Sequence, residues 1–243
     1  MHSPILMYHS ITRVDRDPNQ LCVPPARLDQ QLATLRVLGL RGVSIGELLA
    51  ANQRGRGRNL VGLTFDDGYA DFLTAAVPAL ERHGFTATVF ALSGRPGGTN
   101  AWDDEPTLPL LSVERLRETL ERGMEVGSHG RLHQRLTDLS EPDLHAEVAG
   151  SRAELTEQLG QVPAGFCYPY GAVDATVMQA AAAAGYTYAC AVKVARSATF
   201  ALRRFFAGAG DHPLRLLTKL SLHWSGVYGR EGPELPAITA RVG

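Results

Sequence analysis

The chain has 243 residues, of which 44% are hydrophobic, so it can bury one substantial core, and we expect a single domain over residues 1–243. Its 24 Lys and Arg residues nearly balance its 25 Asp and Glu residues, which excludes the strong overall charge that favours nucleic acid or an anionic membrane as a partner. Three cysteines, Cys22, Cys167 and Cys190, match neither a disulfide framework nor a structural zinc cluster, and we expect reduced thiols.

Short apolar runs rich in Val, Phe, Tyr and Ile recur along the chain and predict buried strands. In chain order these runs are Ile5 to Tyr8, Leu60 to Phe65, Phe85 to Leu92, Met124 to Val126, Phe166 to Tyr168 and Tyr186 to Val192. Helical patterns lie between them. They comprise a leucine repeat from Leu28 to Leu38, a segment after a capping box of Ser44 and Glu47, and the ranges Asp71 to His83, Val113 to Arg122, Glu141 to Leu159 and Asp174 to Ala184.

A glycine stands where each of four predicted helices should stop, at Gly84, Gly123, Gly160 and Gly185, and a strand follows each within a few residues. This alternation of helix and strand predicts a mostly parallel sheet, closed as a barrel. The two least hydrophobic segments, residues 53–59 and 93–109, separate no regions of different composition and indicate loops.

Two adjacent carboxylates, Asp66 and Asp67, follow a predicted strand in the sequence TFDDGYAD. In a parallel α/β fold the carboxyl end of a strand is the catalytic edge. Adjacent residues that leave a strand point to different sides, so one carboxylate can bind a metal while the other handles a proton. An Asp-Asp-Gly turn that caps the next helix is the alternative. We assign Asp71, in the first turn of that helix, to capping.

Two histidines, His129 and His133, follow another predicted strand in the sequence GSHGRLH. Their separation of four residues lets two imidazoles converge on one ion, although two histidines at this spacing are often incidental. An Asp from one strand end and two His from another supply three ligands and leave coordination positions open for water and substrate. That composition indicates a catalytic metal site rather than a closed structural one.

The motifs TFDDGYAD, SHGRLH and FCYPYG, in this order, resemble the first three signature motifs of the polysaccharide deacetylases, the carbohydrate esterase family 4 or NodB-like domain. The resemblance spans about Ile5 to Tyr188. The opening LMYHSI resembles the members in which the terminal histidine motif is circularly permuted to the first strand. The resemblance implies an α/β fold, a distorted (β/α)7 TIM-like barrel. It also implies a metal-dependent hydrolase of non-peptide carbon–nitrogen bonds that removes N-acetyl groups from N-acetylated oligo- or polysaccharides.

The same resemblance implies a role for each residue of these motifs. Asp66 would be the catalytic base and His9 the general acid. Asp67, His129 and His133 would hold a divalent metal, most commonly Zn²⁺, with Mn, Co or Ni as alternatives.

The resemblance also places the residues of FCYPYG around the substrate. Tyr170 would bind the oxyanion through its backbone N–H, Pro169 would fix the turn, and Tyr168 would line the pocket. Tyr69 is a further candidate for substrate contact, and Trp102 could stack on a sugar ring or simply pack.

The sequence departs from the family pattern in three ways. Many members carry, where this chain has Cys167, an Arg that braces the catalytic base, and its absence puts the orientation and pKa of Asp66 in doubt. The Trp-containing fourth motif is not found. His223, in a Leu-rich helical run, is a rival to His9 for the terminal histidine motif, and we favour His9.

Two other functions fit the same residues. One is a non-catalytic carbohydrate-binding or scaffolding protein on this fold, and the other is a deacylase of O-acetyl or small-molecule substrates. The N-terminal sequence lacks a basic region followed by a long apolar stretch, and no window resembles a membrane span, so we expect a cytoplasmic protein. The sequence leaves the sugar, its chain length and the oligomeric state open.

Overall fold

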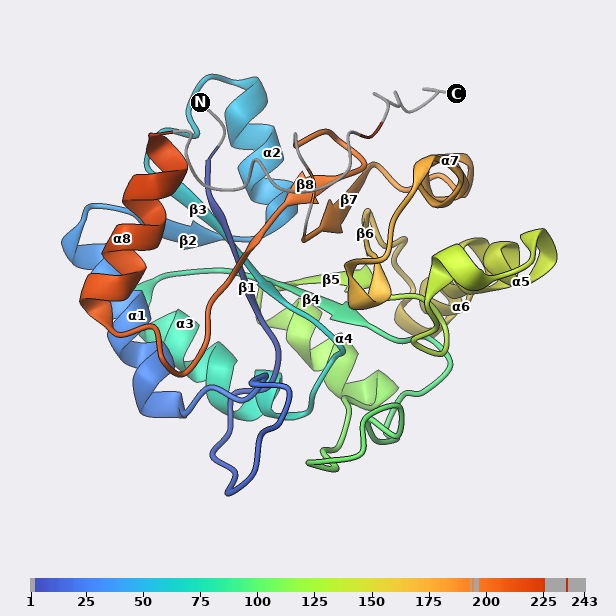
Figure 1. Cartoon of the computed structure of the whole chain (residues 1–243), viewed down its shortest axis with the longest axis horizontal. Helices are drawn as coiled ribbons and strands as arrows, with labels where there is room; N and C mark the ends of the chain where they lie inside the picture. The colour runs from blue at the N-terminus through green and yellow to red at the C-terminus, as the bar shows by residue number, and fades with distance from the viewer. Residues whose placement is uncertain (1–2, 193, 195–196, 226–234, 236–243) are drawn as a thin grey trace.

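A mostly parallel sheet, nearly closed into a barrel, forms the centre of the molecule (Figure 1). The computed structural model describes residues 3–192, 194, 197–225 and 235. Its strands are β1 (Ile5–Tyr8), β2 (Arg41–Val43), β3 (Leu60–Phe65), β4 (Thr88–Ala91), β5 (Glu125–Ser128), β6 (Gly165–Cys167), β7 (Tyr188–Ala191), β8 (Leu202–Arg203) and β9 (Phe205–Phe206). They follow the order β8-β7-β6-β5-β4-β3-β1-β9, and β2 also pairs with β3.

The two edges of this sheet meet in one short segment of chain. β8 pairs in parallel with β7 at one edge, and β9 pairs in parallel with β1 at the other. Only Arg204 separates β8 from β9, so this residue lies where the barrel closes. Every pairing between the named strands is parallel, and their carboxyl ends therefore share one rim.

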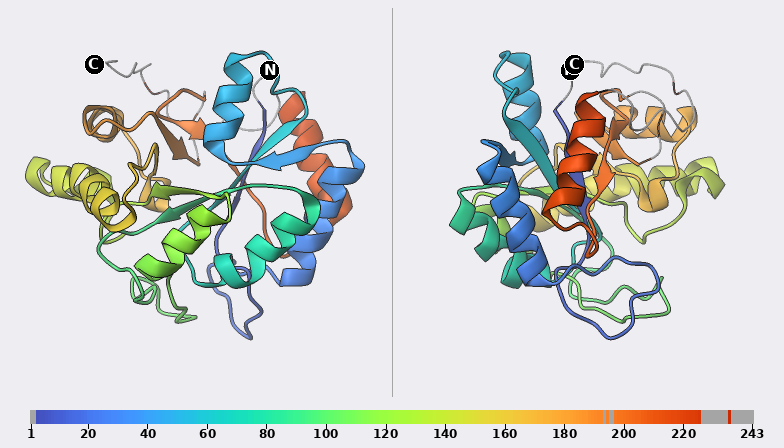
Figure 2. Two further views of the ribbon diagram at one scale, coloured as in Figure 1. Left: turned by 180° about the vertical axis from the view of Figure 1, so that it is seen from behind. Right: turned by 60° about the vertical axis from the view of Figure 1, so that its left-hand side comes forward.

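Helices cover the outside of the barrel (Figures 1 and 2). They are α1 (Pro25–Val37), α2 (Ile45–Gln53), α3 (Val77–His83), α4 (Val113–Glu121), α5 (Glu141–His145), α6 (Ser151–Leu159), α7 (Ala175–Ala183) and α8 (Pro213–Trp224). The leucine repeat of α1 explains its orientation, because Leu28, Leu32 and Leu35 are fully buried while Val37 is 87% exposed. Each such buried leucine contributes about 1.5–3 kcal/mol of transfer free energy.

All six predicted strands are found, with shifts of up to three residues at their ends, and the mostly parallel barrel is confirmed. The strands β2, β8 and β9 were not predicted, because runs of two or three residues carry no periodic signal. Two predicted helices are each interrupted by a π-helical turn, at Phe72–Ala76 and Ala146–Gly150. The expectation of one domain includes segments outside the described residues and stays a prediction.

The capping box predicted for α2 is half correct. The Ser44 hydroxyl accepts a hydrogen bond from the Glu47 backbone N–H at 3.2 Å, as expected for an N-cap. The Glu47 carboxylate does not complete the box. It accepts hydrogen bonds from Arg41 and Thr86 instead, and so ties α2 to β2 and to the segment before β4.

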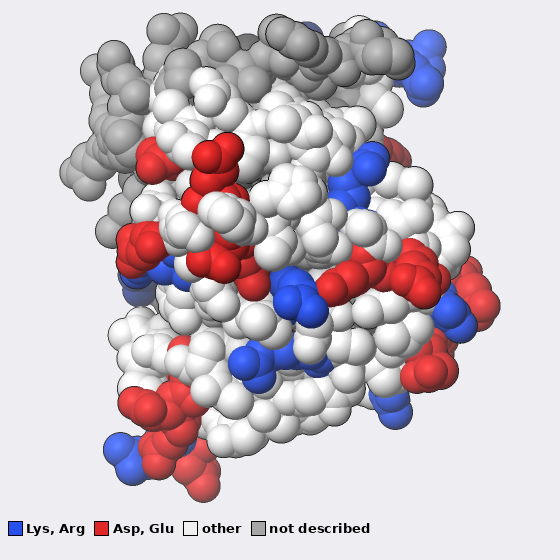
Figure 3. Space-filling model, turned by 90° about the vertical axis from the view of Figure 1, so that its right-hand side faces the viewer, with Lys and Arg blue, Asp and Glu red and all other residues white. Residues whose placement is uncertain are grey.

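The surface shows no single dominant charge on the face drawn in Figure 3, where acidic and basic side chains are interspersed. This distribution agrees with the formal net charge of −1. Among the described residues, no helix combines the length and apolar character needed to cross a bilayer.

Candidate active site

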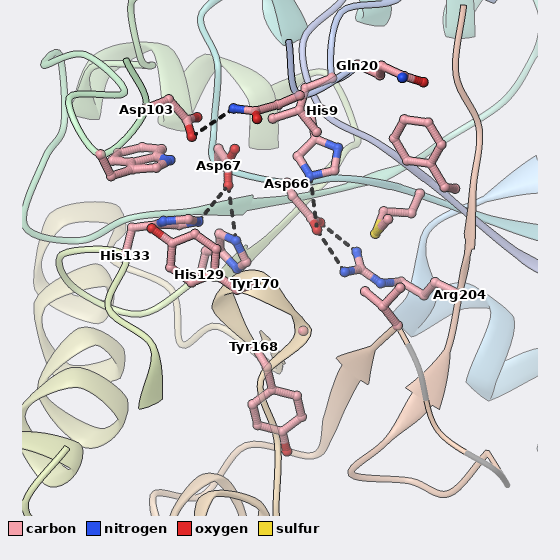
Figure 4. A pocket seen from close by; sticks show the side chains of 17 residues that line it. His9, Gln20, Asp66, Asp67, Asp103, His129, His133, Tyr168, Tyr170 and Arg204 are labelled. Atoms are coloured by element: carbon pink, nitrogen blue, oxygen red, sulfur yellow. Dashed lines mark hydrogen bonds and ion pairs between the residues drawn. The ribbon is translucent and has the colours of Figure 1, made fainter. Parts of the chain in front are cut away.

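The candidate base, general acid and metal ligands follow strands at the shared carboxyl rim of the barrel, and together they line one pocket of about 530 Å³ (Figure 4). His9 follows β1, Asp66 and Asp67 follow β3, and His129 follows β5. His133 lies four residues after His129 in the same loop. The parallel sheet thus brings together residues that are more than a hundred positions apart in the chain.

Asp67, His129 and His133 form a compact ligand set. The Asp67 Oδ1 atom lies 3.1 Å from His129 Nε2 and 3.3 Å from His133 Nε2. One ligand atom from each residue lies within 4.8 Å of the other two, and all three residues are buried. The convergence expected from the sequence is therefore present.

The hydrogen bonding of His129 indicates that this cluster suits a cation. His129 Nδ1 lies 2.8 Å from the Cys167 carbonyl oxygen, which can only accept, so Nδ1 carries a proton. In the neutral ring, Nε2 then carries a lone pair that faces Asp67 Oδ1 at 3.1 Å. Both of these atoms are acceptors, so they attract each other only if a proton or a metal cation lies between them. Burial opposes the charged ring, but hydrogen bonding to Asp67 and the charges of Asp66 and Asp67 raise the pKa of His129. An imidazole fixed in this way by a backbone carbonyl is the usual arrangement of a metal ligand.

A second group of ligand atoms, from Asp66, His129 and Cys167, is equally compact but fits a metal less well. Both oxygens of Asp66 already accept hydrogen bonds from Arg204. Burial raises the pKa of Cys167 well above its usual value, which disfavours the thiolate that metals bind. Of the two groups, the one that contains Asp67 therefore offers the better donors for a cation.

The backbone of the pocket is strained. Four non-glycine residues in the described chain have positive φ angles, and all four line this pocket: Gln20 (56°), Asp67 (70°), His133 (64°) and Tyr170 (57°). Such conformations are costly and gather at functional sites. Glu147 holds one of these loops, since its buried carboxylate accepts the backbone N–H groups of the two residues that precede His133.

Asp66 is held by a buried ion pair with Arg204. Arg204 Nη1 lies 2.6 Å from Asp66 Oδ1, and Nη2 lies 2.7 Å from Oδ2. Arg204 also donates to the Thr64 hydroxyl at 3.0 Å and to Cys167 Sγ at 3.0 Å. Burial alone would raise the pKa of Asp66, but the charge and hydrogen bonds of Arg204 outweigh it, and the pKa is lowered. The carboxylate is thus ionised and fixed in orientation at neutral pH.

His9 faces Asp66 from the next strand. Its Nε2 atom lies 4.0 Å from Asp66 Oδ2. Burial is the main cause of a lowered pKa for His9, against the opposing charges of Asp66 and Asp67. The loop that carries His9 is anchored by Asp71, whose carboxylate accepts from the Ser10 hydroxyl at 2.5 Å and the Ile11 N–H at 2.8 Å.

Residues 53–189, more than half of the chain, match the family model for polysaccharide deacetylase. The chain belongs to the polysaccharide deacetylase family. It is 28% identical to YxkH of Bacillus subtilis (strain 168) over 185 residues, which are 75% of this chain and 62% of that protein. It is 31% identical to the peptidoglycan-N-acetylglucosamine deacetylase PgdA of Listeria monocytogenes over 120 residues, or 49% of this chain and 23% of PgdA. The chain thus spans less than two thirds of both curated relatives.

Two solved structures share the fold. The Streptococcus pyogenes deacetylase PplD, in complex with acetate, superposes with a TM-score of 0.75 at 26% identity, over 90% of this chain and 97% of PplD. IcaB from Ammonifex degensii superposes with a TM-score of 0.73 at 22% identity, over 90% of this chain and 97% of IcaB, and shows the fold alone. These likenesses agree with the NodB-like barrel implied by the sequence.

The deacetylase motif FCYPYG turns sharply after β6. Tyr170 is 51% exposed at the pocket, and its ring meets His133 edge-on with centroids 4.5 Å apart. Tyr168 lines the pocket but is buried, and its hydroxyl donates to the Phe200 carbonyl oxygen at 2.8 Å. Pro169 starts the short helical turn and is buried without lining the pocket, so it serves the turn rather than substrate contact.

Two other residues lie outside the main pocket. Tyr69 is 1% exposed and lines a small neighbouring cavity, and its contact with substrate stays a prediction. The capping role assigned to Asp71 is wrong, because Asp71 stands at the start of the helical turn at Phe72–Ala76 but its side chain makes no capping hydrogen bond there. Its carboxylate instead anchors the loop after His9, which no local pattern reveals.

The rival histidine lies outside the pocket. His223 belongs to α8, and its ring packs edge-on against Phe205 with centroids 4.9 Å apart. His9 lines the pocket and His223 does not, which favours His9 as the general acid. Trp102 does line the pocket, where its ring stacks on His133 at 4.4 Å.

The doubt raised by Cys167 is resolved by Arg204, which the sequence reasoning missed. Arg204 reaches Asp66 from the segment between β8 and β9 and so supplies the brace that many family members place at position 167. The small Cys167 side chain leaves room for it, and Cys167 Sγ contacts both partners. The sequence signal that could have indicated this residue was two adjacent arginines, Arg203 and Arg204, within an otherwise apolar run.

Proposed function

We propose that this member of the polysaccharide deacetylase family is a metal-dependent hydrolase that removes N-acetyl groups from N-acetylated saccharides. The proposal depends on one observation. Asp66, oriented by Arg204, lies in the same pocket as Asp67, His129 and His133, so a carboxylate base stands beside a set of metal-binding side chains. Binding a sugar requires neither a base nor an open metal site, whereas metal-assisted hydrolysis of an amide uses both.

Asp66 would accept the proton of the attacking water, and its lowered pKa keeps it ionised for this role at neutral pH. Asp67, His129 and His133 would hold a divalent ion, Zn²⁺ by expectation, which would supply a Lewis acid for the acetyl carbonyl and for the water. The water oxygen forms the new bond to the acetyl carbon. The backbone N–H of Tyr170 donates to the oxygen that becomes negative.

His9 is placed to complete the reaction. As the C–N bond breaks, the nitrogen needs a proton, and a protonated His9 with a lowered pKa donates more readily than an ordinary histidine. Asp66 Oδ2, 4.0 Å from His9 Nε2, is a source from which His9 regains a proton. The products are acetate and a free amine.

The decisive experiment measures acetate released from a panel of N-acetylglucosamine oligomers by the zinc-loaded protein, with and without chelator. We expect chelator-sensitive release that Asp66→Asn abolishes while the fold, followed by thermal unfolding, is retained. Saccharide binding without acetate release, unaffected by Asp66→Asn, would favour the non-catalytic carbohydrate-binding protein. Release from O-acetylated substrates alone would favour an esterase.

A further inference from the structure

Two loops extend from the carboxyl rim of the barrel and lie side by side (Figures 1 and 2). The first, residues 9–24, links β1 to α1, and the second, residues 92–112, links β4 to α4. They are joined by an ion pair between Arg16 and Glu105 at 3.3 Å and by a hydrogen bond from Asn19 Nδ2 to Asp103 Oδ1 at 3.2 Å. Together they form one wall of the active-site pocket.

Both loops have internal supports that fix the groups on this wall. The Asp17 carboxylate accepts the backbone N–H groups of Leu21 and Cys22 at 2.9 and 2.8 Å. In the other loop, the Asn100 side chain accepts the Leu108 N–H at 2.7 Å and donates to a carbonyl across the same turn. These hydrogen bonds fix the position of the loop that carries Asp103. Figure 4 shows the Asp103 carboxylate pointing toward Asp67 across the pocket.

Three carboxylates line the pocket, and only one has no cationic partner. Asp66 is paired with Arg204, and Asp67 belongs to the metal-binding triad. Asp103 accepts from the neutral amide of Asn19, and among the described residues no Lys, Arg or His forms an ion pair with it. Asp103 is thus a carboxylate on the pocket wall that forms no ion pair with another described residue, so a cationic group of a ligand can pair with it.

We propose that Asp103, positioned by Asn19, binds the ammonium group of a glucosamine unit next to the reacting sugar, so that the enzyme prefers saccharides in which some amines are already free. This inference rests on the proposed function, because each turnover of that reaction makes a cationic amine from a neutral amide. A carboxylate on the pocket wall can receive such an ammonium as a charge-assisted hydrogen bond. Trp102, the preceding residue, lines the same pocket, and its ring stacks on His133.

The chemistry predicts a preference of modest size. Asp103 is partly exposed, and ion pairs in such positions change an equilibrium by roughly fivefold or less. The effect should fall as salt is added, since the pair is open to solvent.

The test uses the zinc-loaded protein and two variants. Asp103→Asn keeps a hydrogen-bond acceptor and removes the charge. Asp104→Asn is the matched control, because it removes a negative charge from an exposed neighbour in the same loop that lines neither the main pocket nor the small cavity beside it. Binding of the fully deacetylated glucosamine tetramer is measured by calorimetry, and kcat/KM is compared for a fully acetylated tetramer and a tetramer with one free amine.

We expect Asp103→Asn to weaken binding of the glucosamine tetramer by roughly fivefold. It should also remove the kinetic preference for the tetramer with a free amine, whereas Asp104→Asn should change neither. Equal binding by the wild type and Asp103→Asn would overturn the inference. The binding measurement needs no turnover, so acetate release from none of the substrates would count against the proposed function, while the calorimetry would still decide the role of Asp103.

Discussion

Replacing Arg204 by Met should both destabilise the protein and disable the base. The substitution keeps an unbranched stem but removes two charge-assisted hydrogen bonds of 2.6 and 2.7 Å and leaves Asp66, 3% exposed, without its guanidinium partner. Removing one partner of a buried pair costs about 3–5 kcal/mol. For a domain of this size each kcal/mol lowers the melting temperature by about 2–4 °C, so we expect a fall of roughly 6–20 °C.

The same substitution should shift the pH dependence of activity. With Arg204 gone, burial dominates and the pKa of Asp66 rises, so the acid limb of kcat/KM moves to higher pH because the base must be ionised. Loss of orientation should lower kcat/KM at neutral pH by about a hundredfold.

Three further variants make the Arg204 experiment decisive. Arg203→Met makes the same substitution at the neighbouring arginine and should leave the acid limb of kcat/KM unchanged. Arg204→Lys retains the charge without the planar fork and should be intermediate. The double variant Cys167→Arg with Arg204→Ala returns the guanidinium to the position used by many family members and should recover part of the activity. An unchanged acid limb and melting temperature in Arg204→Met would refute the role of Arg204.

Other parts of the site give independent predictions. Glu147→Gln offers one acceptor oxygen in place of two to the loop that carries His133, so zinc affinity, measured by chelator competition, should fall by about 10- to 100-fold. Unchanged zinc affinity would show that the loop that carries His133 keeps its conformation without the Glu147 carboxylate. Asp71→Ala frees the loop that carries His9, and kcat should drop by about tenfold with zinc affinity preserved, whereas a parallel loss of zinc would point to general unfolding. In the metal-free protein, folding lowers the pKa of Asp67, so the stability it contributes is present above its unfolded pKa of about 3.9 and is lost as pH falls through the folded value. The urea midpoint should therefore drop steeply on acidification, and the same slope in Asp67→Asn would exclude this carboxylate as its cause.

Much of the fold and the ligand set could be predicted because both depend on local patterns. Strands β1 and β3 are continuous apolar runs, and their ends place Asp66 and Asp67 at the rim. Family motifs then connected these carboxylates with His129 and His133. Each of these residues lies directly after a strand or four positions further along.

The features that could not be predicted depend on contacts between distant segments. Arg204 reaches Asp66 only because the barrel closes at the junction of β8 and β9, and two-residue strands leave no periodic trace in a sequence. The contact between Asn19 and Asp103 joins two loops 84 residues apart. The positive φ angle of His133 could not be predicted either, since only a small minority of histidines adopt this conformation.

The most direct test of the central claim is the zinc content of the purified protein after loading and gel filtration, measured for the wild type, Asp66→Asn and Asp67→Asn. If Asp67 is a metal ligand and Asp66 a base held by Arg204, the wild type and Asp66→Asn should each retain one zinc ion per chain, and Asp67→Asn should lose most of it. Equal zinc content in all three proteins, or none in the wild type, would contradict the metal site on which the proposed chemistry depends.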